Sequence, residues 1–342
     1  MSGNDNDLKA IAQAMVAPGK GVLAADESVA TMSKRLESIG VESTAEVRRD
    51  YRDMLLTTEG LGEYISGSIL FDETLRQKSA DGTAFPQLLE KLGILPGIKV
   101  DTGAKVLAKS PDEKITEGLD GLRERIEEYV SLGAKFAKWR AVITIGDGIP
   151  STYCINANAH ALARYAALCQ EGGLVPIVEP EVLMDADNDI DRCFEVTEAT
   201  HHAVFAELFE QRVDLEAMVL KPNMVLSGKK CETQASVEEV AEKTLALLRR
   251  TVPSAVPGIA FLSGGQSAEV ATAHLNAMNG IGNAPWNLTF SYGRALQDPA
   301  LKAWAGKADN VPAGQQALQT RSKFNSLATS AGYKPDMESE AA

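Results

Sequence analysis

The sequence contains few cysteines and histidines, and neither type is spaced as in a disulfide framework or a metal site. Its four cysteines and four histidines are Cys154, Cys169, Cys193, Cys231, His160, His201, His202 and His274. The cysteines form no C-x-x-C pair, and the histidines form no H-x-H or H-x-x-x-H pattern beside a carboxylate. This spacing argues against zinc catalysis and predicts reduced thiols.

An excess of positive charge and a long apolar run are also missing. The formal net charge of the 342 residues is -13 at pH 7, which argues against binding to nucleic acid or to an anionic membrane surface. No run approaches the ~20 apolar residues of a membrane helix, and the polar, acidic residues 1–7 do not resemble a secretion signal. We therefore expect a cytoplasmic protein without nucleic-acid or membrane partners, in which a local basic pocket could still bind an anionic small molecule.

Short apolar and β-branched runs recur along the whole chain, in which 44% of the residues are hydrophobic. The eight runs are residues 21–26, 64–70, 97–101, 136–142, 174–182, 217–223, 258–265 and 287–293. They begin 29 to 43 residues apart, which leaves room for a helix and two loops between parallel strands. No linker of biased composition divides the chain. We predict a (β/α)8 TIM barrel, an α/β fold, formed by residues 1–342 as a single domain.

The segments between these runs carry helix signals. Two Ser-x-x-Glu patterns fit capping boxes, Ser43 with Glu46 and Ser236 with Glu239. Residues 157–170 are rich in Ala and Leu and precede two glycines, as expected of a helix and its end. Beyond Leu318 we expect a helix of roughly two to three turns, and then an acidic, mobile tail from about residue 334.

Charged side chains follow most of the eight runs. They are Asp26, Lys99, Asp101, Lys138, Arg140, Glu179, Glu181, Lys221 and Arg294. Barrel enzymes build their active sites at the C-terminal ends of the strands, and residues two apart on a strand face the same side. A lysine desolvated there is a candidate nucleophile. Lys221 could instead be an ordinary strand-end residue, and each charged pair a structural ion-pair network, but together the groups favour an active site with a reactive amine.

Glycine turns follow the seventh and eighth runs. The first is Ser263-Gly264-Gly265-Gln266-Ser267, and the second is Gly293-Arg294. Backbone N–H groups of such turns bind anions, and these two loops form the usual phosphate site of TIM barrels. Because Arg294 can pair with a phosphate through two hydrogen bonds, the sequence predicts a phosphorylated substrate.

The chain resembles the class I, Schiff-base fructose-bisphosphate aldolases over nearly its whole length. The similarity runs from the segment Gly19 to Ser28 as far as Trp304. Its most specific motifs are FAKWR at 136–140, VEPE at 178–181, LKPNM at 220–224, FLSGGQS at 261–267 and TFSYGRA at 289–295.

The resemblance implies reversible cleavage of fructose 1,6-bisphosphate to dihydroxyacetone phosphate and glyceraldehyde 3-phosphate, a step of glycolysis and gluconeogenesis, without a cofactor or a metal. In the family pattern Lys221 forms the imine, and the ammonium group of Lys138 favours its free amine. Glu179 moves protons while the carbinolamine loses water, Asp26 takes the proton of the hydroxyl whose carbon–carbon bond breaks, and Glu181 orients the lysines.

The resemblance also implies two phosphate-binding ends and a homotetramer. Expected substrate-binding residues are Ser263, Gly264, Gly293 and Arg294 at one end, and Lys99, Arg140, Lys34, Arg35, Thr31 and Ser28 at the other. Two features depart from the vertebrate members: Ala30-Thr31 stands where they have Gly-Ser, and the last tyrosine is Tyr333 rather than a C-terminal one. Residues 336–342 are expected to be a solvated acidic end, with Glu179, Glu181 or water transferring the proton to the enamine. Another Schiff-base aldolase or a transaldolase, and a non-catalytic barrel scaffold, are the alternative interpretations.

Overall fold

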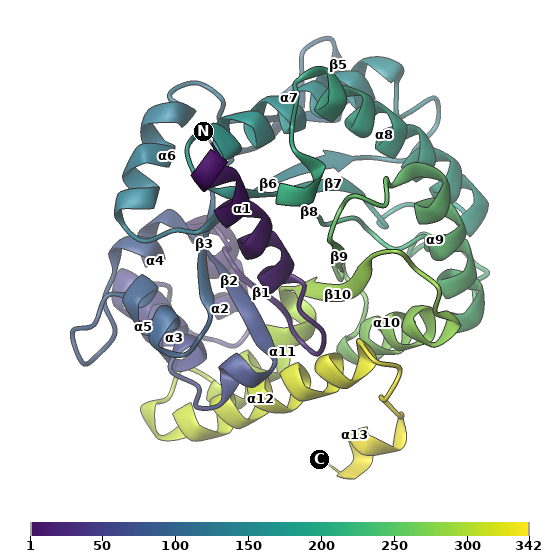
Figure 1. Cartoon of the computed structure of the whole chain (residues 1–342). Coiled ribbons are helices and arrows are strands. Elements are labelled where there is room, and N and C mark those ends of the chain that lie inside the picture. The colour runs from purple at the N-terminus through teal and green to yellow at the C-terminus, as the bar shows by residue number, and fades with distance from the viewer. Residues whose placement is uncertain (1, 341–342) are drawn as a thin grey trace.

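Eight parallel strands pair in chain order and close into a barrel within residues 2–340, the part of the chain that the computed structural model describes (Figure 1). The barrel strands are β1 (Gly21–Ala25), β2 (Ile65–Leu70), β3 (Leu95–Lys99), β6 (Phe136–Ile143), β7 (Val175–Val182), β8 (Val219–Leu220), β9 (Gly258–Phe261) and β10 (Asn287–Tyr292). This architecture confirms the predicted (β/α)8 barrel.

The bounds of six strands lie within two residues of the runs that predicted them, whereas β8 is much shorter than residues 217–223 and β9 ends at Phe261 rather than at residue 265. The backbone N–H of Lys221 still donates to the Val178 carbonyl at 2.8 Å. The next residue, Pro222, has no N–H to donate, so the ladder cannot continue. Lys221 therefore makes the last N–H donation before this break, and Pro222 takes part only through its carbonyl group, which accepts from the Leu262 N–H at 3.1 Å.

Helices connect the strands, precede the first one and follow the last one. They are α1 (Ser2–Met15), α2 (Val29–Glu37), α3 (Ala45–Leu56), α4 (Asp72–Arg76), α5 (Phe85–Lys91), α6 (Leu122–Ser131), α7 (Thr152–Glu171), α8 (Ile190–Glu210), α9 (Val237–Thr251), α10 (Ala268–Ile281), α11 (Arg294–Trp304), α12 (Val311–Ala328) and α13 (Asp336–Glu340). Short 3-10 turns occupy Leu61–Glu63, Leu215–Ala217 and Ala308–Asn310. Within the described residues, no helix is both long and apolar enough to span a membrane.

Of the two predicted capping boxes, the one at Ser236 is confirmed as an N-cap. The Ser236 hydroxyl accepts from the Glu239 N–H at the start of α9. The prediction at Ser43 is wrong by one residue, because Thr44 is the N-cap of α3 and accepts from the Val47 N–H. The Ser43 hydroxyl instead accepts from the Ser33 hydroxyl and the Arg48 guanidinium.

Two elements went unpredicted, and the C-terminal part differs from expectation. Helix α1 precedes the first strand, and a hairpin of β4 (Gly103–Leu107) and β5 (Ser110–Glu117) follows β3. The last long helix, α12, begins before Leu318. Beyond it, Glu338 of α13 pairs with Arg321 and accepts from the Tyr333 hydroxyl. Because of these contacts, α13 is not the fully solvated end that we expected. Its mobility stays a prediction.

Two apolar clusters hold the fold together. The larger lies between the strands and the outer helices. The smaller fills the N-terminal end of the barrel, where Met15 and Val16 near the end of α1 meet Phe136, Val175 and other inward-facing strand residues. Figure 1 shows α1 crossing that end of the barrel. Gly97 of β3 is required here, because a Cβ on it would lie 2.2 Å from the Phe136 ring.

Candidate active site

A cavity of about 1240 Å³ opens at the C-terminal ends of the barrel strands. Ten lysine and arginine side chains line it against seven carboxylates, a local excess of positive charge in a chain whose net charge is -13. All fifteen site residues named from the sequence line this one cavity. The structure therefore brings them together, while their individual roles remain predictions.

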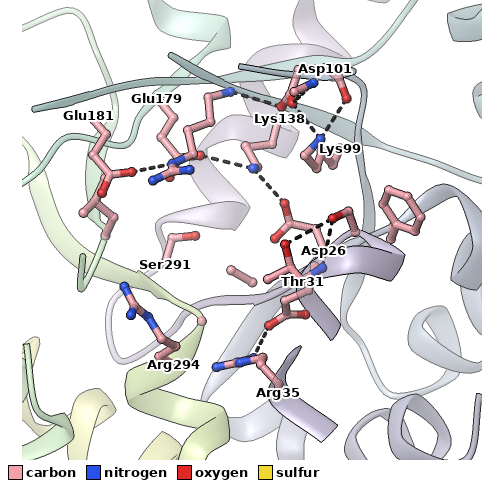
Figure 2. A pocket seen from close by; sticks show the side chains of 18 of the residues that line it. Asp26, Thr31, Arg35, Lys99, Asp101, Lys138, Glu179, Glu181, Ser291 and Arg294 are labelled. Atoms are coloured by element: carbon pink, nitrogen blue, oxygen red, sulfur yellow. Dashed lines mark hydrogen bonds and ion pairs between the residues drawn. The ribbon is translucent and has the colours of Figure 1, made fainter. Parts of the chain in front are cut away.

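A chain of alternating amines and carboxylates forms the floor of the cavity (Figure 2). Lys221 Nζ lies 3.2 Å from Glu179 Oε1, and Glu179 Oε2 lies 3.3 Å from Lys138 Nζ. Lys138 Nζ also lies 2.7 Å from Asp26 Oδ2. The side chains of Lys221, Lys138 and Glu179 are each 4% exposed, so the charges interact in a medium of low polarity, where their mutual effects are large.

The ionisation of these groups follows from burial and from their neighbours. Burial favours the neutral form of Asp26, but the ammonium groups of Lys138 and Lys221 outweigh it and lower the pKa of Asp26 to about 2. Burial likewise opposes the charge of Glu179, whose pKa is nevertheless lowered by Lys138, Lys221 and Arg140. The pKa of Lys138 is raised, because Asp26, Glu179 and Asp101 together overcome its desolvation. Both carboxylates are therefore ionised, with Lys138 held as a cation between them.

Glu181 contacts a different partner from the one predicted. We expected it to orient the lysines, but its ion-pair partner among the described residues is Arg140, whose Nε donates to it. Lys99 and Asp101, which stand two residues apart in the sequence, form an ion pair with Lys99 Nζ 2.6 Å from Asp101 Oδ1. Asp101 also accepts from the backbone N–H groups of Gly103 and Arg140. The second carboxylate of β7 thus positions a guanidinium, while the first contacts the amines.

The two glycine turns meet at the opposite side of the cavity. Gly264 has φ +64°, a left-handed conformation that favours glycine, and Arg294 donates to its carbonyl group. Ser263, Gly264, Gly293 and Arg294 all line the cavity. A guanidinium and two glycine turns in the loops after β9 and β10 can bind a phosphate group.

Helix α2 supplies the remaining predicted binding residues. Ser28 is its N-cap and accepts from the Thr31 N–H, and the two hydroxyl groups lie 3.1 Å apart. Arg35 already has carboxylate partners, since it pairs with Glu27 and donates to Asp298 at 2.7 Å. It can reach a second phosphate only by sharing or exchanging these partners. Lys34 is exposed at the cavity rim.

Sequence reasoning missed Ser291 of β10, which Figure 2 labels beside the predicted residues. Its hydroxyl group is buried, faces the cavity and has no hydrogen-bond partner among the described residues. A signal was available, because Ser291 stands two residues before Gly293 and so faces the same side of the strand. Residues 2–340 contain no group of three or more His, Cys, Asp or Glu side chains placed to hold a metal ion.

The fold and the cavity define the class of protein: a (β/α)8-barrel enzyme with buried amines and carboxylates at the C-terminal ends of its strands. The family model of the class I fructose-bisphosphate aldolases, described as glycolytic, matches residues 7–342. The chain therefore belongs to this family and functions as a class I aldolase, which confirms the resemblance seen in the sequence.

Individual relatives agree with the family model. The chain is 60% identical to a probable fructose-bisphosphate aldolase class 1 of Xanthomonas campestris, over 96% of this chain and 98% of that protein. It is 53% identical to cytosolic fructose-bisphosphate aldolase 4 of Arabidopsis thaliana, over 94% of this chain and 82% of that protein. The solved structure of Plasmodium falciparum fructose-bisphosphate aldolase, in complex with TRAP and a small-molecule inhibitor, superposes with a TM-score of 0.95 and 49% identity, over 97% and 96% of the two chains.

Proposed function

We propose that the cavity cleaves fructose 1,6-bisphosphate reversibly through an imine on Lys221. The observation that carries the proposal is the series of ionic contacts from Lys221 through Glu179 and Lys138 to Asp26, in a cavity whose opposite side can bind phosphate. Nucleophilic catalysis by lysine needs an amine within reach of a proton acceptor in a desolvated site. Lys221 supplies the amine, and Glu179 supplies the proton acceptor.

Imine formation uses Lys221 and Glu179. The amine attacks the ketone carbon of the substrate after its proton passes to Glu179, 3.2 Å away. The carbonyl oxygen receives one proton from the attacking nitrogen, which gives the carbinolamine, and a second proton from Glu179. Water then leaves, and the protonated imine remains. When Lys221 gives up its charge, one of the cations that lower the pKa of Glu179 disappears, so the carboxyl group becomes a better proton carrier during this step.

Carbon–carbon cleavage uses the imine and Asp26. Asp26 takes the proton of the hydroxyl group on the far carbon of the breaking bond, and that carbon leaves as the aldehyde of glyceraldehyde 3-phosphate. The bonding electrons move onto the imine nitrogen and produce an enamine. Because the pKa of Asp26 is about 2 in the free enzyme, the carboxylate is ionised and can accept a proton that becomes acidic as the bond breaks. Protonation of the enamine and hydrolysis release dihydroxyacetone phosphate and restore Lys221.

The two phosphate groups define the orientation of the substrate. One lies on Ser263, Gly264, Gly293 and Arg294, and the other lies toward Lys99, Arg140, Lys34 and Arg35, with Ser28 and Thr31 at the start of α2. The positive excess of the cavity supports this arrangement, since it attracts a dianionic group into a negatively charged protein. The active protein is a cytoplasmic homotetramer in this proposal, a state supported by the family resemblance and testable by its mass in solution.

Borohydride trapping tests the proposal directly. Borohydride added with dihydroxyacetone phosphate should inactivate the enzyme and leave a reduced adduct on Lys221, because it reduces an imine to a stable amine. Peptide mass mapping locates the adduct. An adduct on Lys138 alone, or none, would remove Lys221 from the reaction. A coupled assay of fructose 1,6-bisphosphate cleavage with and without chelator should show equal rates, whereas a loss restored by metal would contradict the metal-free reaction.

A further inference from the structure

The loop between β9 and α10 is held from behind by a side chain that does not face the cavity. The Ser263 carbonyl accepts from the Gly265 N–H at 2.7 Å and from the Gln266 N–H at 3.0 Å. It also accepts from Gln266 Nε2 at 3.2 Å. One carbonyl oxygen thus organises the turn that presents Ser263 and Gly264 to the substrate.

His274 of α10 fixes the Gln266 side chain. Its Nδ1 lies 2.6 Å from Gln266 Oε1. The amide orientation follows from the other end of the side chain, where Nε2 donates to Ser263 and leaves Oε1 as the acceptor. The Nδ1 atom of His274 must therefore carry a proton and donate it. His274 is 5% exposed, and because burial lowers its pKa to about 4, the ring is neutral near pH 7.

Gln266 also contacts the segment that carries the reactive lysine. Its Nε2 lies 3.6 Å from the Met224 sulfur, three residues beyond Lys221. The backbone adds a second link, since the Leu262 N–H donates to the Pro222 carbonyl at 3.1 Å. The amide thus ties the phosphate loop and the lysine segment together.

The orientation of one peptide group connects this network to the phosphate. A trans peptide is planar, so its C=O and N–H point in opposite directions. When Gln266 holds the Ser263 carbonyl, the N–H of Gly264 must point away from Gln266. Ser263 and Gly264 line the cavity, whereas Gln266 and His274 do not. The anchored carbonyl therefore aims a backbone donor toward the place where an anion would bind.

We infer that His274 is a positioning residue for the substrate phosphate, acting through Gln266 on the Ser263–Gly264 peptide. The inference rests on the proposed function, because it assigns a phosphate to this loop. It concerns binding of the phosphate end and not the chemistry at Lys221. Loss of the His274 N–H frees the Gln266 amide to rotate, and the loop then presents its N–H groups in several orientations.

Three variants and two probes test the inference. His274→Leu removes the donor, His274→Asn keeps an N–H near the position of Nδ1, and Gln266→Met removes the amide with a similar volume. Each is inactivated with borohydride at increasing concentrations of dihydroxyacetone phosphate or of dihydroxyacetone, which has no phosphate. For His274→Leu and Gln266→Met we expect the half-saturating concentration of dihydroxyacetone phosphate to rise about fivefold to twentyfold, with kcat for the bisphosphate changed less than about threefold. His274→Asn should stay within about twofold of the parent.

Dihydroxyacetone separates a positioning role from a structural one. Its trapping should be equal in all variants, because it makes no phosphate contact, whereas a damaged barrel would slow trapping with both ketones. His201→Leu is the matched control, since His201 is also a buried helical histidine, bonded to Thr251 rather than to this loop. It should lower stability without changing phosphate dependence. If the parent is not trapped at all, the proposed function fails. If the parent is trapped and both Gln266→Met and His274→Leu match it, the positioning role alone is wrong.

Discussion

The two ends of the barrel have opposite chemistry, although the same strands build both. Inward-facing positions on β6 and β7 begin with Phe136 and Val175, and further along the same strands they include Arg140 and Glu181. At the N-terminal end these side chains join α1 in a dry apolar cluster. At the C-terminal end they are ionised groups around a cavity. Stability and reactivity are thus separated along each strand.

This separation has an energetic reason. Buried ion pairs rarely stabilise a fold, because the desolvation of each charge offsets their attraction. Lys138 and Glu179 are buried, and the Asp26 side chain is only 12% exposed, so the C-terminal end gains little stability from them. The apolar N-terminal end stabilises the fold by about 25 cal/mol for each Å² of apolar surface that it removes from water. A destabilising but reactive end can exist because the opposite end is packed with hydrocarbon.

The most direct test of this separation is to substitute two inward-facing residues near the end of one strand. Lys221→Met should lower kcat by at least about 10³-fold and abolish borohydride trapping, since a thioether cannot form an imine. Val219 stands two residues earlier, is fully buried and belongs to the apolar cluster. The second variant is Val219→Ala. It should cost about 1 to 3 kcal/mol of unfolding free energy with kcat within about twofold.

Denaturant unfolding and the cleavage assay measure both quantities for each variant. A loss of kcat in Val219→Ala as large as that in Lys221→Met would show that the ends are not separable. Lys221→Met should unfold before the parent, because Glu179 loses one of its two amine partners, so kcat is compared below the unfolding transition of each variant.

The sequence predicted the reactive end much better than the apolar end. Charged residues two apart stand out at the ends of apolar runs, so Lys138 and Glu179 could be placed from their spacing alone. Helix α1 was missed because its apolar residues, such as Leu8 and Met15, follow a polar, acidic start that obscures their helical spacing. Partner choice was also out of reach, since the Glu181 to Arg140 pair depends on how two strands meet.

The apolar end should depend on α1. Met15→Ala removes a fully buried side chain from the cluster and should cost about 2 to 5 kcal/mol of unfolding free energy. The kcat below the unfolding transition should stay unchanged, because the cavity lies at the other end. Gln13→Ala, at an exposed position of the same helix, is the matched control. If both variants unfold with the parent, α1 does not stabilise the barrel.

At the cavity, Arg294→Ala should weaken binding of the bisphosphate by roughly 1.5 to 3 kcal/mol, the range for a charge-assisted contact to phosphate. The fold should survive, since Arg294 is exposed and its hydrogen bond is to one loop carbonyl. The KM and the dissociation constant for dihydroxyacetone phosphate report the change. Arg123→Ala, which removes an exposed arginine that pairs with Glu171 and does not line the cavity, should leave both constants alone. Unchanged constants in Arg294→Ala would exclude a phosphate contact.

The smallest effect belongs to α13, which lies outside both ends of the barrel. Truncation after Pro335 removes Glu338 and with it an ion pair to Arg321, whose side chain is 5% exposed. Arg321 keeps its hydrogen bonds to the Ala268 carbonyl and the Thr272 hydroxyl at the start of α10, so the catalytic loops should not move. We expect a loss of about 1 kcal/mol in unfolding free energy, reduced by salt, and hydrogen exchange at the dihydroxyacetone phosphate carbon within about twofold of the parent.

Two single variants show whether the stability loss comes from the Glu338–Arg321 ion pair or from the negative charge of α13 in general. Glu338→Gln should reproduce most of the stability loss, whereas Asp336→Asn, an equal change of charge at an exposed position, should not. Exchange slowed more than about tenfold by the truncation, equivalent to ~1.4 kcal/mol of barrier, would show that α13 takes part in catalysis. That result would contradict a solely structural role, because the contacts that α13 makes to Arg321 and Tyr333 leave the Lys221 cluster untouched.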